Sequence, residues 1–137
     1  MKGTYALLVD LPETTSVKVG RLGEIRFDNG FYAYIGSAMN GLKGRIERHL
    51  GDDKNFHWHI DYLLSESKVE KVLFGENEEK KECEVARSAA DSFTIVKNFG
   101  ASDCRCDSHL FYAKGFSRLE KKIKSSFEKS GLTVKEW

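Results

Sequence analysis

The chain has 137 residues, a length that fits one compact domain able to bury roughly two-thirds of its unfolded surface. Hydrophobic residues make up 40% and charged residues 31%, which is ordinary for a soluble globular protein. The 22 basic and 21 acidic side chains nearly cancel, so the overall charge gives no argument for nucleic acid.

The first expected element is a strand over 3–11, GTYALLVDL, which stops at Pro12. Its apolar run is interrupted by Asp10 and is too short for a signal sequence or a membrane span. Three cysteines, an odd number without framework spacing, are typical of a reducing compartment. We therefore expect a cytoplasmic protein with no membrane partner.

The next segments predict an exposed hairpin followed by another strand. VKVG (17–20) and EIRF (24–27) alternate apolar and polar residues, as hairpin strands do. Asn29-Gly30 is a strong turn signal, and FYAYIG (31–36) then has the composition of a strand.

After Gly36 the hydrophobic period becomes helical. Leu42, Ile46 and Leu50 recur every four residues and predict a helix over 41–50, with Asn40 placed to cap it. Residues 56–66 are expected to be helical or mixed.

The second half alternates strands and helices. We expect strands over 69–75 and 109–113, a helix over 78–92, and a closing helix whose Ser117 and Glu120 suggest a capping box. Gly131 would end that helix. The order predicts a single α+β domain over 1–137, with a small mixed or antiparallel sheet flanked by helices and an inserted hairpin.

Charge is unevenly distributed along the chain. Segment 114–129 carries six Lys or Arg against two Glu, whereas 76–84 holds five Glu against two Lys. This pattern permits a basic face on a nearly neutral protein, although two solvated helix surfaces would give the same pattern.

The helix over 41–50 carries Arg45 and His49 four residues apart, hence on one face. A guanidinium offers a planar fork of donors suited to phosphate oxygens, and histidine can move a proton near neutral pH. The alternative is a solvated face whose basic residues lie where the helix dipole favours them.

A family resemblance favours the phosphate interpretation. Gly3-Thr4-Tyr5 in the first strand, Tyr34-Ile35-Gly36 in a later strand, and the run YIGSAMNGLKGRIERHL resemble the GIY-YIG nuclease superfamily. The stretches HWHIDYLL (57–64), ECEVA (82–86) and FGASDCRCDSHLFY (99–112) are similar to a small single-domain branch of that superfamily.

The resemblance implies a phosphodiester-cleaving site. It assigns Tyr5, Tyr34 and Arg45 to that site, and a glutamate, best matched by Glu82, to one Mg²⁺ or Mn²⁺ ion. On this view Arg45 clamps the non-bridging oxygens, and a tyrosine takes the proton of the attacking water.

Other residues compete with the tyrosines or extend the site. His49 or His57 is the competing base. Backbone contacts to nucleic acid are expected from five basic side chains: Lys43, Arg48, Lys121, Lys122 and Lys124.

The two motif tyrosines are separated by residues 6–33, much farther than is usual in the superfamily, and the hairpin at 17–27 fills this gap. An inserted hairpin leaves the phase of the two strands unchanged, so they can still pair.

A second constellation of residues suggests zinc. His57, His59 and Asp61 lie together in sequence, as do Cys104, Cys106 and His109. The spacings match no standard zinc module, and packed free cysteines are common, so zinc is the less favoured ion.

The leading hypothesis is a metal-dependent endonuclease acting on DNA or structured nucleic acid. A protein partner or an oligomer would supply specificity, because no second DNA-reading module is evident. The alternatives are a non-catalytic nucleic-acid-binding or interaction module, and a zinc-stabilised domain that uses His57, His59, Cys104 and Cys106.

Overall fold

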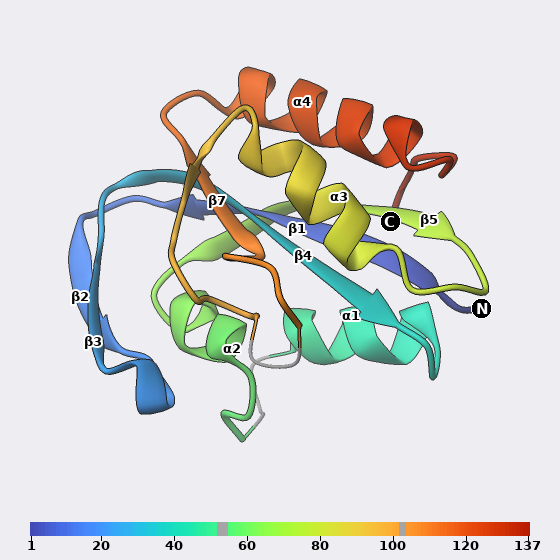
Figure 1. Ribbon diagram of the computed structural model, residues 1–137. Coiled ribbons are helices and arrows are strands. Elements are labelled where there is room, and N and C mark those ends of the chain that lie inside the picture. The colour runs from blue at the N-terminus through green and yellow to red at the C-terminus, as the bar shows by residue number, and fades with distance from the viewer. Residues whose placement is uncertain (52–54, 102–103) are drawn as a thin grey trace.

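The computed structural model describes residues 1–51, 55–101 and 104–137 (Figure 1). Its elements follow in the order β1 (Gly3–Leu11), β2 (Thr15–Lys18), a 3₁₀ turn (Gly20–Leu22), β3 (Glu24–Phe27), β4 (Gly30–Ala38), α1 (Leu42–Leu50), α2 (His59–Leu64), β5 (Lys68–Glu76), α3 (Glu82–Ala90), β6 (Thr94–Ile95), β7 (Leu110–Ala113), α4 (Phe116–Lys129) and β8 (Lys135–Glu136).

The main sheet has six strands in the order β6-β7-β4-β1-β5-β8, and its neighbouring strands pair antiparallel. The predicted α+β class is therefore confirmed. The predicted hairpin is present as β2 and β3, which form a separate two-stranded sheet. It leaves the pairing of β1 with β4 intact, with Tyr5 opposite Gly36 and Leu7 opposite Tyr34.

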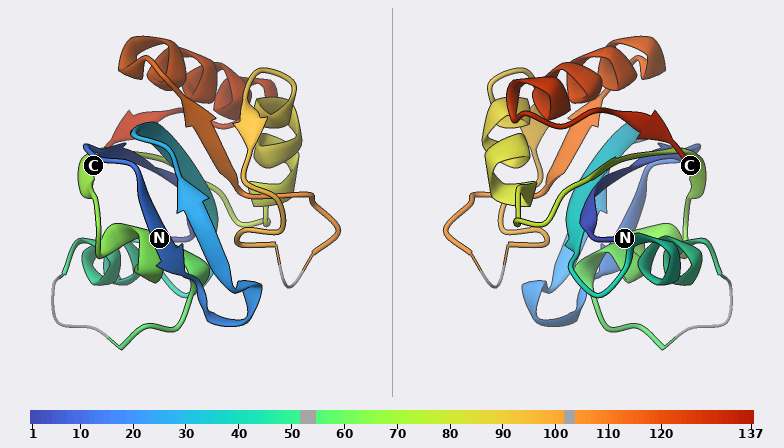
Figure 2. Two further views of the ribbon diagram at one scale, coloured as in Figure 1. Left: turned by 90° about the vertical axis from the view of Figure 1, so that its left-hand side faces the viewer. Right: turned by 90° about the vertical axis from the view of Figure 1, so that its right-hand side faces the viewer.

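Helices cover both faces of the main sheet, with α1 and α2 on one side and α3 and α4 on the other (Figures 1 and 2). Side chains of β1 alternate between the two cores, because successive residues of a strand point to opposite faces. Tyr5 and Leu7 pack with α1 and α2, whereas Ala6 and Leu8 pack with α3 and α4.

The predicted cap of α1 is wrong. The helix is preceded by Gly41, and no side chain caps it. The first helical amide, that of Leu42, donates instead to the backbone carbonyl of Met1 at 2.8 Å. A carbonyl from the start of the chain thus satisfies an amide for which the sequence had suggested Asn40.

The predicted capping box of α4 is also wrong. Gly115 precedes the helix, so Ser117 lies one residue inside the first turn and cannot act as the cap. The Glu120 carboxylate instead pairs with Lys71 on β5 and with Lys124 at 3.2 Å. At the other end Gly131 adopts a φ of 82° and follows the helix, as predicted.

Within the described parts of the chain, every helix is too short or too polar to cross a membrane.

Candidate functional site

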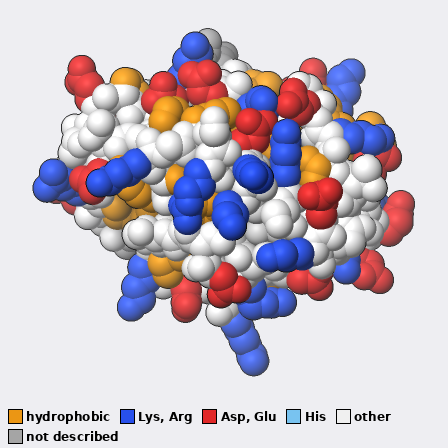
Figure 3. All heavy atoms as spheres, turned by 90° about the horizontal axis from the view of Figure 1, so that it is seen from above, with side chains coloured by type: hydrophobic (Ala, Val, Ile, Leu, Met, Phe, Trp, Pro, Cys, Tyr) orange, Lys and Arg blue, Asp and Glu red, His pale blue; other side chains and the backbone are white. Residues whose placement is uncertain are grey.

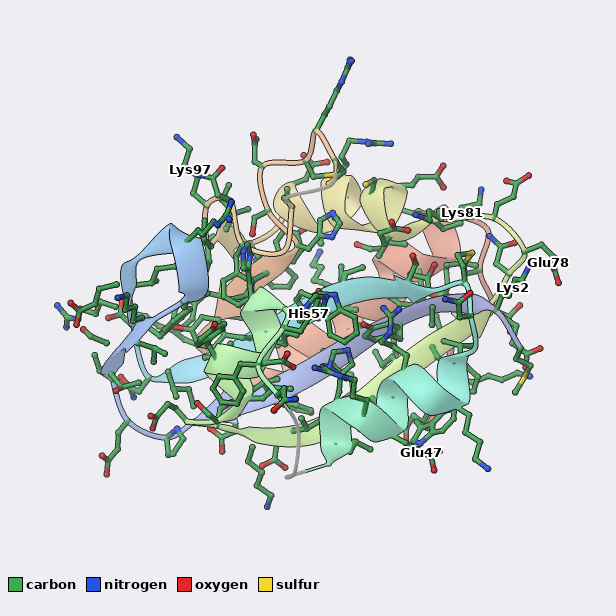
Figure 4. All side chains as sticks on the ribbon, turned by 90° about the horizontal axis from the view of Figure 1, so that it is seen from below. Lys2, Glu47, His57, Glu78, Lys81 and Lys97 are labelled. Carbon is green, nitrogen blue, oxygen red and sulfur yellow. The ribbon has the colours of Figure 1, made fainter. Side chains whose placement is uncertain are left out.

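A pocket lies at one end of the sheet, where α1, the segment before α2, the start of α3 and the loop before β7 meet. Its volume of about 590 Å³ lies within the range of roughly 300–1,000 Å³ that is typical of ligand sites. In Figure 4, His57 lies over the sheet between α1 and α2, and Lys81 marks the start of α3. The lining residues are Tyr5, Tyr34, Gly36, Ser37, Met39, Asn40, Arg45, His57, Trp58, His59, Lys80, Glu82, Gly100, Cys104 and His109.

The two motif tyrosines lie side by side at the floor of the pocket. Their ring centroids are 6.5 Å apart, and both residues are almost fully buried. Burial raises the pKa of Tyr5 to about 12, although the neighbouring Arg45 guanidinium opposes the shift. Burial also raises the pKa of Tyr34, and the nearby charge of Glu82 adds to that rise. Both phenols are therefore protonated at neutral pH.

His49 provides Tyr5 with a proton acceptor. The hydroxyl of Tyr5 donates to Nε2 of His49 at 2.7 Å when that nitrogen is unprotonated. The imidazole is buried beneath the pocket and does not line it. The helix face that carries His49 therefore faces the sheet, and this hydrogen bond connects His49 to the pocket through the hydroxyl of Tyr5.

Gly36 leaves the space that the Tyr5 ring occupies. A Cβ atom at this position would lie 2.6 Å from Cζ and Oη of Tyr5, closer than such atoms approach. Since Tyr5 and Gly36 are directly opposite on β1 and β4, the glycine allows the phenol to cross the neighbouring strand and reach His49.

Arg45 is held at the wall of the pocket by two contacts. Its Nη1 donates to the carbonyl oxygen of Ser37 at 3.0 Å, and its guanidinium carbon lies 4.5 Å from the centre of the Trp58 ring. These contacts fix the direction of the guanidinium, which has five N–H donors and so retains others for a ligand.

Asp61 ties α2 to α1. Its side chain is fully buried and accepts hydrogen bonds from both terminal nitrogens of Arg48, at 3.0 and 3.1 Å. It also accepts from the backbone amides of His57 and Trp58 at 2.8 and 2.9 Å. Burial alone would raise the pKa of Asp61, but these hydrogen bonds outweigh it and hold the pKa below its usual value.

The side chain of Arg48 makes its contacts within the protein. The side chain that we expected to contact nucleic acid is engaged with Asp61 and stacks on Trp58 at 4.2 Å. Arg48 thus orients the tryptophan against which Arg45 also packs. Its contribution to the site is to position other groups.

Glu82 opens α3 and lines the pocket opposite Arg45 and the tyrosines. Its Oε2 atom is buried, and none of the described residues gives it a hydrogen bond. A buried carboxylate oxygen without a donor is costly unless a cation or water reaches it. The Glu82 side chain lines the pocket, so the residue fits the role of a ligand to a hard divalent cation.

Behind Glu82 lies a group of side chains suited to a softer metal, here called the Cys₃His cluster. It consists of Cys83, Cys104, Cys106 and His109, whose ligand atoms lie within 4.8 Å of one another. This group could hold a metal ion. Burial, as the largest cause, raises the pKa values of the Cys83 and Cys106 thiols and lowers that of His109.

The two histidines of the alternative zinc set, His57 and His59, lie outside this cluster. His57 is exposed at the pocket mouth, and Nδ1 of His59 accepts a hydrogen bond from the Gly100 amide at 2.8 Å. Of the stretch FGASDCRCDSHLFY, residues 102–103 lie outside the described part of the chain.

None of the four remaining basic residues lines the pocket, and they lie on two different sides of the sheet. Lys43 is exposed on α1, whereas Lys121, Lys122 and Lys124 belong to α4 on the opposite side of the sheet. Figure 3 shows that face, where several Lys and Arg side chains gather near the middle and acidic side chains lie mostly around them.

Sequence reasoning missed three contributors. Trp58 packs against both arginines, Lys80 lines the pocket, and Cys83 joins the cysteines from α3. The aspartate four residues after His57 in HWHID was a usable signal for the turn that places Trp58, since it is suited to accept amides at a helix start. Cys83 carried no such signal, because it lies 21 residues before Cys104.

Comparison with known proteins gives one match. The family model described as "Domain of unknown function DUF123" matches residues 4–132, which is nearly the whole chain. No curated protein and no solved structure matches the chain.

Proposed function

Because the chain belongs to the DUF123 family, a domain family of unknown function, its activity has to be inferred from the site, and we propose that it is a divalent-metal-dependent endonuclease. The substrate class is DNA or structured nucleic acid, and the reaction is hydrolysis of a phosphodiester bond. The observation that carries the proposal is that Tyr5, Tyr34, Arg45 and Glu82, drawn from four different elements, line one pocket. These are the residues that the resemblance to GIY-YIG nucleases implies.

The metal part of the proposal depends on Glu82. The Glu82 side chain lines the pocket, and its buried Oε2 has no hydrogen-bond donor among the described residues. An Mg²⁺ or Mn²⁺ ion, when bound there, supplies Lewis-acid stabilisation of the charge that develops on phosphate.

Arg45 supplies the complementary charge. Its contacts with the Ser37 carbonyl and the Trp58 ring orient the guanidinium before any substrate arrives. Remaining N–H donors then bind the non-bridging oxygens, whose charge increases as water attacks phosphorus. A donor that is oriented in advance costs no reorganisation in the transition state, so it favours that state over the ground state.

Tyr5 and His49 handle the proton. As the water oxygen forms its bond to phosphorus, the water's proton moves to Oη of Tyr5, and the phenolic proton moves to Nε2 of His49 across the 2.7 Å hydrogen bond. The bond between phosphorus and the leaving oxygen breaks in the same step. A phenol with a pKa of about 12 is a weak acid, so the imidazole acceptor is what makes Tyr5 usable near neutral pH.

The shape of the nucleic acid would determine which substrates bind, because the pocket is small and lies at one end of the sheet. Exposed Lys80 and Lys43 lie on the same side as the pocket and would contact neighbouring phosphates. A protein partner or a second copy of the chain would supply further specificity.

The test is cleavage of supercoiled plasmid and of branched DNA with Mg²⁺ or Mn²⁺. We expect nicking by the wild type that stops on chelation, and a loss of about 10²–10³-fold in rate for Arg45→Ala. Arg26→Ala is the matched control, because Arg26 is exposed on the β2–β3 hairpin and pairs only weakly with Asp28 at 3.5 Å. Binding without cleavage by the wild type, unchanged in both variants, would instead favour a non-catalytic binding module.

A further inference from the structure

The four ligand atoms of the Cys₃His cluster lie close enough together to hold one metal ion. Nε2 of His109 lies 3.5 Å from Sγ of Cys104 and 3.7 Å from Sγ of Cys83. A tetrahedral zinc ion with Zn–S bonds of about 2.3 Å and a Zn–N bond of about 2.0–2.1 Å requires sulfur-to-nitrogen edges of about 3.6 Å. Both distances therefore match the edges of a zinc tetrahedron.

The chemical character of the ligands selects the ion. Three thiols and one imidazole are soft or borderline donors, which favour zinc over magnesium or manganese. Four protein ligands fill a tetrahedron and leave no open position, which is the pattern of structural rather than catalytic zinc.

The cluster connects two separate parts of the fold, the loop before β7 and the start of α3. Fourteen positions, 96–109, separate β6 from β7, and the described ones, 96–101 and 104–109, belong to no helix or strand. Connections of about this length without secondary structure of their own are uncommon and usually functional. Backbone hydrogen bonds close the base of this connection, with the Asn98 amide donating to the Asp107 carbonyl at 2.7 Å and the His109 amide to the Phe99 carbonyl at 2.8 Å. Beyond that base, Cys104 and Cys106 meet Cys83 of α3.

We propose that the Cys₃His cluster binds one structural zinc ion that fastens the loop before β7 to the first turn of α3. The ion would join two walls of the pocket, because Cys104 and His109 line it and Cys83 follows Glu82 directly. Zinc therefore fixes the place of Glu82 without taking part in the reaction. The inference rests on the cluster's own geometry and stands whether or not the pocket cleaves nucleic acid.

The experiment begins with protein purified under reducing conditions without chelator, from cells supplied with zinc. Elemental analysis is expected to find about one zinc per chain. Replacement by Co²⁺ should give the visible bands of tetrahedral cobalt together with thiolate-to-cobalt charge-transfer absorption. Removal of zinc from the wild type with a chelator should lower Tm, and re-addition should restore it, because an ion bound only by the folded state stabilises that state.

Variants separate this site from the pocket. Cys83→Ser and Cys106→Ser should each weaken zinc binding by more than the roughly 10–100-fold that loss of an outer partner costs. Asp107→Asn, an exposed change in the same loop, and Glu82→Gln, a change beside Cys83, should each retain one zinc per chain. Since the chelator experiment uses the wild type, it tests the proposal even if a cysteine variant fails to fold.

Three results would overturn the proposal. One is protein that contains less than about a tenth of a zinc per chain and takes up no Co²⁺. Another is bound Co²⁺ that lacks charge-transfer absorption from thiolates. The third is a thiol titration, on protein to which no reductant was added, that finds a single free thiol. Two of the three cysteines would then form a disulfide and could not bind zinc.

Discussion

At the scale of single residues, Tyr5 is the point where the fold and the proposed chemistry meet. Its ring belongs to the core between the sheet and α1, while its hydroxyl reaches His49 at the pocket floor. Removing only the hydroxyl separates the two roles.

Tyr5→Phe is expected to lower the single-turnover cleavage rate by about 10²–10⁴-fold, because the attacking water loses its route to His49. The free energy of unfolding should fall by only about 1 kcal/mol, the usual net value of one hydrogen bond. Tyr112→Phe is the matched control, since its hydroxyl donates to the Asn29 carbonyl away from the pocket. Equal rates for the two variants would exclude Tyr5 from proton transfer.

Gly36 gives a second prediction at this scale. Gly36→Ala places a methyl group 2.6 Å from the Tyr5 ring, so we expect a loss of about 1–3 kcal/mol of stability through overpacking. Gly44→Ala, in the first turn of α1 with open space around it, should instead stabilise by up to about 0.5–1 kcal/mol. Urea unfolding of both variants measures the contrast, and a neutral Gly36→Ala would show that Tyr5 can move without cost.

At the scale of elements, the short helix α2 owes its place to Asp61. Six residues form too short a helix to be stable alone, and the buried carboxylate binds both the amides before the helix and Arg48 of α1. The attachment is electrostatic, so it depends on pH.

Asp61→Asn should lower stability at pH 7 by about 1.5–3 kcal/mol, because a charged acceptor is lost. The folded pKa of Asp61 lies below its unfolded value of about 3.9, so its contribution is complete above that value and disappears as the pH falls through the folded pKa. The difference in the free energy of unfolding between wild type and Asp61→Asn, measured with urea, should therefore become smaller below about pH 4. Asp28→Asn, which removes the exposed ion pair with Arg26, should change the free energy of unfolding very little at any pH. A loss of stability in Asp61→Asn that does not change with pH would contradict the argument.

The sequence predicted some helices and strands closely and gave no indication of others. The period of Leu42 and Ile46 predicted α1 nearly to the residue, and the Asn29-Gly30 turn predicted where β4 begins. The predicted cap of α1 was wrong, because the Met1 carbonyl that satisfies the Leu42 amide is distant in sequence. Strands β6 and β8 have two residues each, too few for any periodicity to reveal.

In the candidate site, too, the sequence predicted the residues that belong to local patterns and missed a residue whose partners are distant in sequence. Tyr5, Tyr34, Arg45 and Glu82 were identified because they stand in recognisable local patterns, and the structure brings them to one pocket. The fourth member of the Cys₃His cluster escaped because pairing Cys83 with Cys104 requires knowing that α3 begins beside the loop before β7. His49 was expected beside Arg45 as a competing base at the site, and α1 buries it against the sheet beneath the pocket.

At the scale of the whole molecule, the sheet lies between the pocket and the lysines of α4. The pocket opens on one end beside α1 and α2, whereas the lysines of α4 lie across the sheet. Screening limits the reach of exposed charges to about 8–10 Å at physiological salt. A short duplex bound at the pocket is therefore beyond the reach of α4, and only a longer or branched substrate would contact both faces.

This separation predicts a length dependence. Lys121→Glu together with Lys122→Glu should leave binding of a short duplex nearly unchanged while weakening a long branched substrate. Lys80→Glu, at the pocket, should weaken both. Fluorescence anisotropy at fixed salt makes the comparison, and equal weakening of the short duplex by both changes would show that α4 takes part in binding at the pocket.

The central claim is that Glu82 holds the divalent cation of a phosphodiester-cleaving site, and one comparison tests it most directly. Glu82→Gln and Glu84→Gln remove the same charge two residues apart on α3, but Glu82 lines the pocket while Glu84 is exposed. We predict that Glu82→Gln lowers the Mg²⁺-dependent plasmid cleavage rate by at least about 10²-fold, with Glu84→Gln within about twofold of the wild type. Cleavage by Glu82→Gln at the wild-type rate would contradict the account.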